Sequence, residues 1–169
     1  MHVIDITIDN REQSPWAFPD HLVTARWGTL KTGDYALTGD AGFAIERKSL
    51  GDFLGSISTG WDRFKRELDR MGQANFPAKV VIIEGDYAAC CFIESNGEII
   101  PPRHDHQRLT PRFVNMRIAD LSLMGVACVF AGNAAYASAL ACAILKKRQM
   151  DLINGKNNDT PHRDEGNAR

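Results

Sequence analysis

Hydrophobic and polar residues alternate at the start of the chain, where Ile4, Ile6 and Ile8 are separated by polar residues. Alternation with a period of two predicts a strand that buries one face. Farther along, the run KVVIIE at 79–84 is apolar almost throughout, which is typical of a strand in a sheet covered on both faces. Strands are predicted over residues 2–9, 22–30, 34–38, 43–48, 79–84 and 126–131.

Apolar residues recur at helical spacing after residue 48, beginning with Leu50, Phe53, Leu54 and Ile57. Ser49 can cap the start of this helix, because its hydroxyl can accept a backbone N–H and Asp52 follows three residues later. The pair Thr59-Gly60 is expected to end it. Further helices are predicted over residues 61–71, 111–125 and 133–150, and residues 87–93 can form a short one.

The order of these elements predicts an α/β fold in which a central mixed sheet is flanked by helices. We expect one domain over residues 1–150 and a disordered tail over 151–169, because the end of the chain is polar and lacks an apolar pattern. With 44% hydrophobic residues and no apolar run near the roughly 18 residues that a span requires, the sequence predicts no membrane segment.

Composition adds two constraints on function and location. The net charge is −1 at pH 7, so the chain does not resemble a basic protein that coats nucleic acid, although an enzyme with a local basic face remains compatible. The four cysteines have no metal-site spacing, and three lie in apolar stretches. Free thiols and the lack of a signal peptide predict a cytoplasmic location.

The candidate chemistry lies at the end of the fourth predicted strand. Side chains alternate along a strand, so Glu46 and Lys48 share one face and Arg47 lies on the other. Asp34 begins the partner strand of the same hairpin. Simple pairing across a four-residue turn would place Tyr35 opposite Glu46, so a three-residue loop or a bulge is needed to bring Asp34 there.

Two converging carboxylates suit Mg²⁺, which takes one or two protein acids and fills its other positions with water and phosphate oxygens. Such an ion polarises a phosphate group and lowers the pKa of a bound water. Lys48 can stabilise negative charge in the transition state or orient the attacking water. An isolated Glu-x-Lys is more often a surface ion pair, so the pattern alone leaves that alternative open.

The residues around this pair form further motifs in a fixed order. They are Asp9-Asn10-Arg11-Glu12, Gly33-Asp34 and Glu46-Arg47-Lys48-Ser49-Leu50-Gly51-Asp52. In this combination the sequence resembles the XPF-type nuclease domain, of the XPF and Hef class within the PD-(D/E)XK superfamily. The resemblance implies a restriction-endonuclease-like core and a nuclease domain over residues 1–150. Paired helix-hairpin-helix modules, which many members carry, have no counterpart after residue 150, so we expect a stand-alone form.

The resemblance implies roles for the residues nearest the chemistry. Asp34 and Glu46 would ligate Mg²⁺ or Mn²⁺, together with the backbone carbonyl of Arg47. Lys48 would be the catalytic lysine. The side chain of Arg47, on the opposite face of the strand, would hold the helix or the sheet in place.

Three other acids of the motifs are expected close to the site. By resemblance, Asp9 and Glu12 would border the metal, and Asp9 would help to hold the ion or a water molecule. Asp52 would support the site from the start of a helix. A plain capping role explains Asp52 equally well.

Basic residues and the last helix suggest two kinds of partner. The candidates for contact with the DNA backbone are Arg11, Arg63, Lys65 and Arg66. A solvated helix face is the alternative for the last three, because neighbouring acids dilute their charge. In the last helix, Ala137 and Ala141 form a small-residue face that fits either a close-packed core or a homodimer through the C-terminal helices.

Together these features predict a metal-dependent DNA endonuclease that hydrolyses phosphodiester bonds. By resemblance it would be structure-specific, acting on flap, fork or branched DNA in repair or recombination. Two alternatives stay open. One is a catalytically silent module that binds DNA or protein, and the other is a junction resolvase or exonuclease of the same superfamily.

Overall fold

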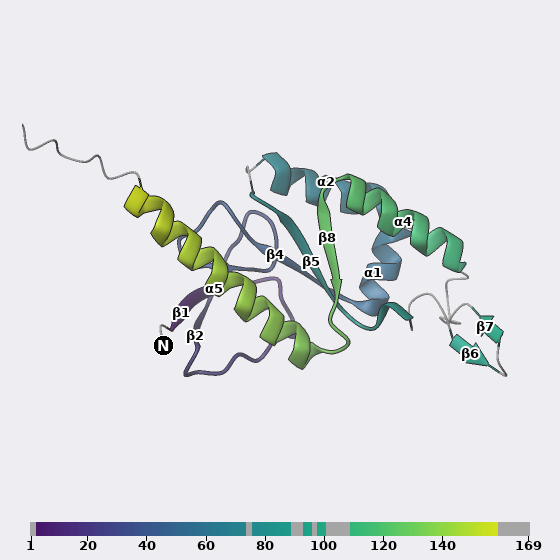
Figure 1. The fold of residues 1–169 in the computed structure, drawn as a ribbon, viewed down its shortest axis with the longest axis horizontal. Coiled ribbons are helices and arrows are strands. Elements are labelled where there is room, and N and C mark those ends of the chain that lie inside the picture. The colour runs from purple at the N-terminus through teal and green to yellow at the C-terminus, as the bar shows by residue number, and fades with distance from the viewer. Residues whose placement is uncertain (1–2, 74–75, 89–92, 96–97, 101–108, 159–169) are drawn as a thin grey trace, which may run out of the picture.

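The computed structural model describes residues 3–73, 76–88, 93–95, 98–100 and 109–158. Its centre is a six-stranded sheet with the strand order β2-β1-β3-β4-β5-β8 (Figure 1). The strands are β1 Ile4–Asp9, β2 Val23–Gly28, β3 Tyr35–Leu37, β4 Ile45–Ser49, β5 Lys79–Glu84 and β8 Val126–Phe130. The helices are α1 Leu50–Ile57, α2 Trp61–Gln73, α4 Pro111–Leu123 and α5 Ala134–Asn158. The prediction of a mixed sheet flanked by helices is confirmed.

Strand direction changes at β3. That strand is antiparallel to both of its neighbours, β1 and β4. By contrast, β1 and β2 run parallel, as do β4 with β5 and β5 with β8. The central position of β3 therefore brings the end of β1, the start of β3 and the end of β4 to one edge of the sheet.

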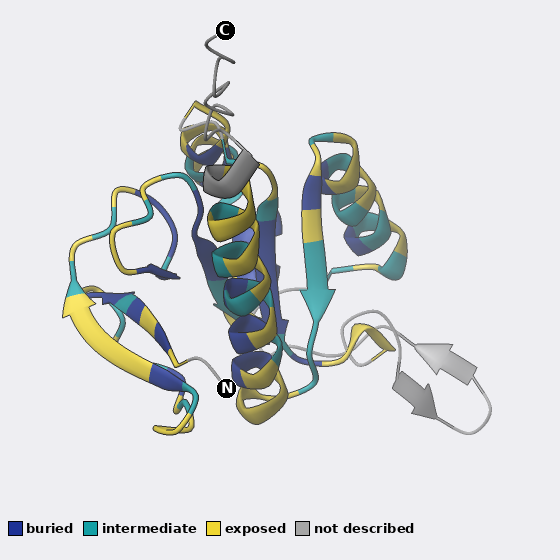
Figure 2. Cartoon of the chain, turned by 60° about the vertical axis from the view of Figure 1, so that its left-hand side comes forward, coloured by how far each residue is buried: buried dark blue, intermediate teal, exposed yellow. Residues whose placement is uncertain are grey.

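Helices cover both faces of the sheet, as Figure 1 shows. Val81 and Ile83 of β5 pack against α1, α2 and α4 in one core, whereas Val80 and Ile82 face α5 in a second core. Figure 2 shows α5 lying along the sheet, with its buried residues interrupted by exposed ones. Alternation along β5 thus distributes its side chains to two cores, as expected for a strand buried on both sides.

Helix α1 begins as the capping pattern predicts. The Ser49 hydroxyl accepts a hydrogen bond from the Asp52 amide at 3.1 Å and donates one to the Asp52 carboxylate at 2.7 Å. Phe53, Leu54 and Ile57 then form its buried stripe. Because β4 ends at Ser49 and α1 starts at Leu50, no loop separates the candidate site from this helix.

The small residues of α5 belong to the core. Ala137 and Ala141 are fully buried and pack in the cluster that includes Ile4 and Ile82 of the sheet. Close approach of helix and sheet explains the small-residue face without a second subunit. The free thiol of Cys142 is buried in the same cluster, as expected for a cysteine in an apolar stretch, where a thiol packs like a small hydrophobic residue.

Two predicted boundaries are wrong. The last helix does not stop at residue 150 but continues to Asn158, with Leu152 packed against the core and Lys147 paired with Asp151 one turn away. These contacts stabilise a polar segment that the sequence pattern had indicated to be disordered. Near the predicted short helix, Tyr87 and Ala88 are helical, but Ile93 already belongs to strand β6 (Ile93–Ser95), which pairs with β7 (Glu98–Ile100).

Several expectations fall on residues that the structure does not describe. They concern residues 89–92, which include two of the cysteines, and residues 159–169 of the expected tail. Within the described ranges, no helix has both the length and the apolar character needed to cross a bilayer.

Candidate active site

The register of the β3–β4 hairpin brings two acids together. Tyr35 pairs with Ile45, and the Asp34 amide donates to the Ile45 carbonyl at 2.8 Å. Continuing this antiparallel register by one residue places Asp34 opposite Glu46, on the same face of the sheet. The need for a shifted register, expected from the sequence, is thereby confirmed.

The backbone before Asp34 explains why glycine precedes it. Gly33 has a φ of 76°, which L side chains rarely adopt, and a Cβ there would lie 2.6 Å from the Cβ of Ala44. Any larger residue would push the start of β3 away from β4. Gly33 is therefore required for the close approach that puts Asp34 beside Glu46.

Asp9 is the third acid in a row across the sheet, but its carboxylate binds neighbouring loops. Its strand pairs Ile8 with Tyr35, so Asp9 lies opposite Asp34. The Asp9 carboxylate accepts hydrogen bonds from the Arg11 amide at 2.9 Å, from Arg11 Nε at 2.5 Å and from the Leu30 amide at 2.7 Å. Burial raises its pKa, but these hydrogen bonds outweigh burial and hold it below its usual value. Asp9 thus fixes two loops beside the site.

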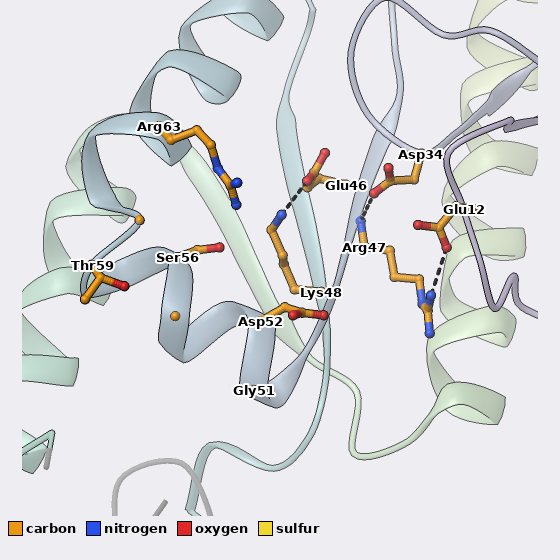
Figure 3. Close-up of a pocket in the computed structure, with 12 residues that line it drawn as sticks. Glu12, Asp34, Glu46, Arg47, Lys48, Gly51, Asp52, Ser56, Thr59 and Arg63 are labelled. Atoms are coloured by element: carbon orange, nitrogen blue, oxygen red, sulfur yellow. Dashed lines mark hydrogen bonds and ion pairs between the residues drawn. The ribbon is translucent and has the colours of Figure 1, made fainter. Parts of the chain in front are cut away.

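Asp34, Glu46 and Lys48 meet at a cleft of about 590 Å³ (Figure 3). Lys48 Nζ lies 2.7 Å from Glu46 Oε1, and Asp34 Oδ2 accepts a hydrogen bond from the Arg47 amide at 2.7 Å. The three side chains therefore face the same side of the sheet. The cleft is lined by Glu12, Asp34, Glu46, Arg47, Lys48, Gly51, Asp52, Gly55, Ser56, Thr59, Gly60 and Arg63.

The charges in the cleft leave the two acids short of a cation. Burial and the nearby Glu46 carboxylate raise the pKa of Asp34 to about 7. Burial lowers the pKa of Lys48, but the attraction of Glu46 and its hydrogen bond outweigh burial, so the net shift is upward and the amine stays charged. Among the described residues, the Lys48 ammonium group is hydrogen-bonded to Glu46, and the Asp34 carboxylate accepts one hydrogen bond, from the Arg47 amide. A divalent cation would compensate both carboxylates.

Arg47 points to the opposite face and ties three segments together. Its guanidinium contacts Glu12 Oε2 at 2.8 Å and Glu84 Oε1 at 2.7 Å. Trp16 lies 5.9 Å from the guanidinium and donates its indole N–H to the same Glu84 oxygen. The expectation that the Arg47 side chain holds the sheet in place agrees with this geometry, because the loop after β1, strand β4 and strand β5 share one ion-pair cluster.

Sequence reasoning gave no role in this cluster to Trp16 or Tyr35. Trp16 is only 4% exposed, and its amide donates to the Tyr35 hydroxyl at 3.0 Å. The Tyr35 hydroxyl in turn donates to Glu12 at 3.3 Å, and the two rings stack at 4.5 Å. The sequence shows an aromatic residue in a polar loop and another on a strand. Their positions in the sequence do not reveal that the two rings stack on each other.

Known proteins were found that share the sequence family and the fold of this chain. The ERCC4 domain family matches residues 8–144. The chain belongs to the ERCC4 domain family. XPF from Aeropyrum pernix superposes with a TM-score of 0.62 at 21% identity, over 85% of this chain and 61% of that chain. XPF from the same organism in complex with DNA gives 0.61 at 23% identity, over 88% and 66%.

The chain spans 61% and 66% of the two archaeal chains, which is less than two thirds of each. At these identities the likeness shows the shared fold. A comparison with curated protein sequences gave no match.

The first helices of the ERCC4 domain form one wall of the cleft. Asp52 lines the cleft and also caps α1 through Ser49, so both of its expected roles are compatible with one position. Glu12 lines the cleft as well, although its carboxylate is held by Arg47. Among the described residues Asp9 does not line it.

The four candidate DNA-contact residues of the ERCC4 domain lie in different surroundings. Arg63 lines the cleft, and its side chain is 71% exposed. Arg11 is 68% exposed but bound to Asp9. Lys65 pairs with Asp62 at 3.0 Å, and Arg66 is exposed on α2 outside the cleft. Of the four, only Arg63 lines the cleft that contains Asp34 and Glu46.

The donor set of the ERCC4 domain fits a hard cation. Within the described residues, no three metal-ligating side chains are already gathered around one point. Mg²⁺ commonly takes only one or two protein carboxylates and keeps several waters, which Asp34 and Glu46 can supply without a third acid. The open cleft leaves room for those waters and for phosphate oxygens.

Proposed function

We propose that this ERCC4 domain is a metal-dependent DNA endonuclease that hydrolyses phosphodiester bonds. The observation that carries the proposal is the hairpin register, which sets Asp34 opposite Glu46 while Lys48 Nζ lies 2.7 Å from Glu46 Oε1. A pair of acids can hold a divalent ion that polarises the phosphate and activates a water, and an adjacent ammonium group can stabilise the negative charge that develops in the transition state.

The residues would divide the chemistry as follows. Asp34 and Glu46, with the backbone carbonyl of Arg47, would hold Mg²⁺ or Mn²⁺. The bound ion would polarise the scissile phosphate and lower the pKa of a bound water. Lys48, kept protonated by its surroundings, would stabilise the negative charge that develops on the phosphate in the transition state. Asp52 would support the site from the start of α1, and Arg63 would contact a substrate phosphate at the wall formed by α1 and α2.

DNA is the proposed substrate, and branched forms such as flaps and forks are preferred by resemblance to the family. A relative with the same fold, XPF from Aeropyrum pernix, has been crystallised with DNA. In this chain, exposed Arg63 at the cleft offers a cation for a phosphate group next to the acids. The basic residues Arg11, Lys65 and Arg66 would extend that contact, and cutting would serve DNA repair or recombination.

The test is cleavage of labelled flap, fork, four-way junction and linear DNA by the purified chain, in Mg²⁺, Mn²⁺ or EDTA. We expect endonucleolytic cutting of branched DNA that needs a divalent cation. Glu46→Ala and Lys48→Ala should each lower the rate by about 100-fold or more. The matched controls Asp20→Ala and Lys147→Ala, at exposed positions away from the cleft, should leave it unchanged.

The outcomes separate the alternatives. Undiminished cutting by Glu46→Ala or Lys48→Ala would reject the proposed site. DNA binding without metal-dependent cutting of any substrate would identify a catalytically silent module. Cutting only from DNA ends, or only at four-way junctions, would identify an exonuclease or a junction resolvase instead.

A further inference from the structure

Lys48 lies between two carboxylates that come from different elements. Its Nζ is 2.7 Å from Glu46 Oε1 on the same strand and 3.9 Å from Glu67 Oε2 on α2. The ring of Phe64, one turn before Glu67, lies 5.3 Å from the same nitrogen. The ammonium group therefore has a near acceptor at Glu46 and a second acceptor slightly too far for a hydrogen bond.

The near acceptor is also the proposed ligand of a divalent cation. A cation bound to Glu46 would repel the ammonium group and compete with it for the same carboxylate. The Lys48 side chain is only 12% exposed, so solvation by bulk water would not replace a lost carboxylate. Lys48 thus needs another acceptor close to its present position when Glu46 binds a metal.

We propose that Glu67 is a positioning residue, the acceptor to which the Lys48 ammonium group moves when a divalent cation binds Glu46. The inference rests on the proposed function. The side chain of Glu67 is 23% exposed, and closing the 3.9 Å gap needs a movement of roughly one ångström at the end of a flexible lysine. A cation–π contact with the Phe64 ring would stabilise the ammonium group during this movement.

Glu67 also connects Lys48 to the surface of the cleft. Its other oxygen, Oε1, lies 3.6 Å from Arg63 Nε, and Arg63 lines the cleft. A phosphate group that draws Arg63 toward the substrate would leave the Glu67 carboxylate to Lys48 alone. DNA contact and metal binding should therefore favour the same position of Lys48.

The experiment measures Mn²⁺ binding without DNA, from the electron paramagnetic resonance signal of free Mn²⁺. Wild type is compared with Glu67→Gln, Glu67→Asp, Lys48→Met and the double variant Lys48→Met/Glu67→Gln. Asp69→Asn, which also removes a charge from α2 at an exposed position, is the matched control. Thermal unfolding of each variant checks that it is folded.

We expect Glu67→Gln to raise the Mn²⁺ dissociation constant by at most about tenfold, because Glu67 acts on the ligand Glu46 through Lys48, and groups bonded directly to a ligand typically change affinity by about 10–100-fold. Glu67→Asp should recover part of the loss, and Asp69→Asn should bind as wild type does. Lys48→Met should bind Mn²⁺ more tightly than wild type, because the competing ammonium group is gone. In that background Glu67→Gln should have no further effect.

Two results would overturn the role of Glu67 while leaving the metal site intact: an unchanged dissociation constant in Glu67→Gln, or an equal loss in the Lys48→Met background. The second would mean that Glu67 acts through its charge alone. If wild type binds no Mn²⁺, or binds it equally well as Glu46→Ala, the proposed metal site itself fails and the inference fails with it.

Discussion

At the scale of single residues, neighbouring acids differ because their partners differ. Asp9 and Asp34 lie opposite each other on adjacent strands, yet the pKa of Asp9 is lowered and that of Asp34 is raised. Three hydrogen bonds from a basic side chain and two amides satisfy Asp9, whereas Asp34 receives one from the Arg47 amide and faces Glu46. The unsatisfied acid is the one that would gain from a bound cation.

Asp34 predicts a stability that falls as pH rises. The folded protein keeps the Asp34 proton up to a pKa of about 7, whereas the unfolded chain loses it near 3.8, so the free energy of unfolding decreases between these values. Asp34→Asn removes this loss. In EDTA at pH 8 we expect the variant to be more stable by up to about 4 kcal/mol, because the pKa of Asp34 rises from 3.8 to about 7 on folding and each unit corresponds to roughly 1.4 kcal/mol.

Urea unfolding at pH 3 and pH 8 measures this effect, and the two proteins should converge at pH 3, where Asp34 is mostly protonated in both the folded and the unfolded state. A variant that is no more stable than wild type at pH 8 would show that ionisation of Asp34 does not destabilise the folded protein. Activity should be lost in the variant at either pH.

Removing the Arg47 side chain should lower the free energy of unfolding substantially. Arg47→Ala leaves Glu12 and Glu84 without their cation although each side chain is only 15% exposed, and breaking such a pair costs about 3 kcal/mol. Burial raises the pKa of Glu84, but the Arg47 hydrogen bond outweighs it and lowers the pKa overall, so this stabilisation is present above about 4.5 and is lost as pH falls.

The difference in free energy of unfolding between wild type and Arg47→Ala should therefore be large at pH 7 and smaller at pH 3.5. Arg26→Ala is the control, because Arg26 is 63% exposed and only 4.0 Å from Asp5, a pair worth about 0.5 kcal/mol or less. Equal effects of the two substitutions would contradict a structural role of the Arg47 cluster.

At the scale of elements, the position of the acids depends on how the β3–β4 hairpin is held. Arg148 of α5 binds the turn residue Asp40 through two nitrogens, at 2.8 and 3.2 Å. Asp40 Oδ1 also accepts the Gly42 amide at 2.9 Å, which shapes the loop. A contact between positions 108 residues apart in sequence thus supports the register that sets Asp34 opposite Glu46.

Some of these elements were predictable, and some were not. Alternation was enough to place Glu46 and Arg47 on opposite faces, and the Ser49–Asp52 spacing was enough to start α1. For the β3–β4 register, the sequence showed only that a shorter loop or a bulge was needed. The register itself depends on Arg148 and on the positive φ of Gly33. The partners of Asp9 were missed for the same reason, since loop backbones at Arg11 and Leu30 supply them.

Helix α1 predicts a conflict between stability and activity at Gly55. A Cβ at Gly55 would meet nothing within 4 Å, so the fold does not need glycine, and alanine in a helix interior is more stable by about 1 kcal/mol. Gly55 lines the cleft, where the added methyl group would meet the substrate. We expect Gly55→Ala to raise the melting temperature and to lower kcat/KM for DNA cleavage.

Gly155→Ala in α5 is the matched control, because a Cβ there also meets nothing within 4 Å and the residue lies outside the cleft. It should stabilise without changing cleavage. Full activity of Gly55→Ala would show that the substrate does not approach this wall of the cleft.

At the scale of the whole molecule, two helical layers enclose a sheet whose acidic edge stays open. Helix α5 packs over the half of the sheet that contains β1, and α1, α2 and α4 pack over β5 and β8 on the other face. The sequence was sufficient for this arrangement because β5 is apolar on both sides. The length of α5 beyond residue 150 was missed because the packing of Leu152 against the core is tertiary, and the local Lys147–Asp151 pair alone does not predict it.

Dimerisation through the C-terminal helix stays a prediction. Its small residues are used in the core, but Tyr136, Met150 and Ile153 remain 50–68% exposed on α5. Sedimentation equilibrium should give twice the chain mass of 18.8 kDa, and Ile153→Asp should shift the protein to monomer. A monomer at every concentration would show that α5 does not form a homodimer interface.

Anomalous diffraction from crystals soaked in Mn²⁺ measures whether Asp34 and Glu46 hold one metal ion together. We expect a peak between the Asp34 and Glu46 carboxylates, within coordination distance of an oxygen of each, and we expect it to disappear in Glu46→Ala crystals. A Mn²⁺ ion bound elsewhere in a chain that cuts DNA, with no peak between these two acids, would contradict the proposed metal site.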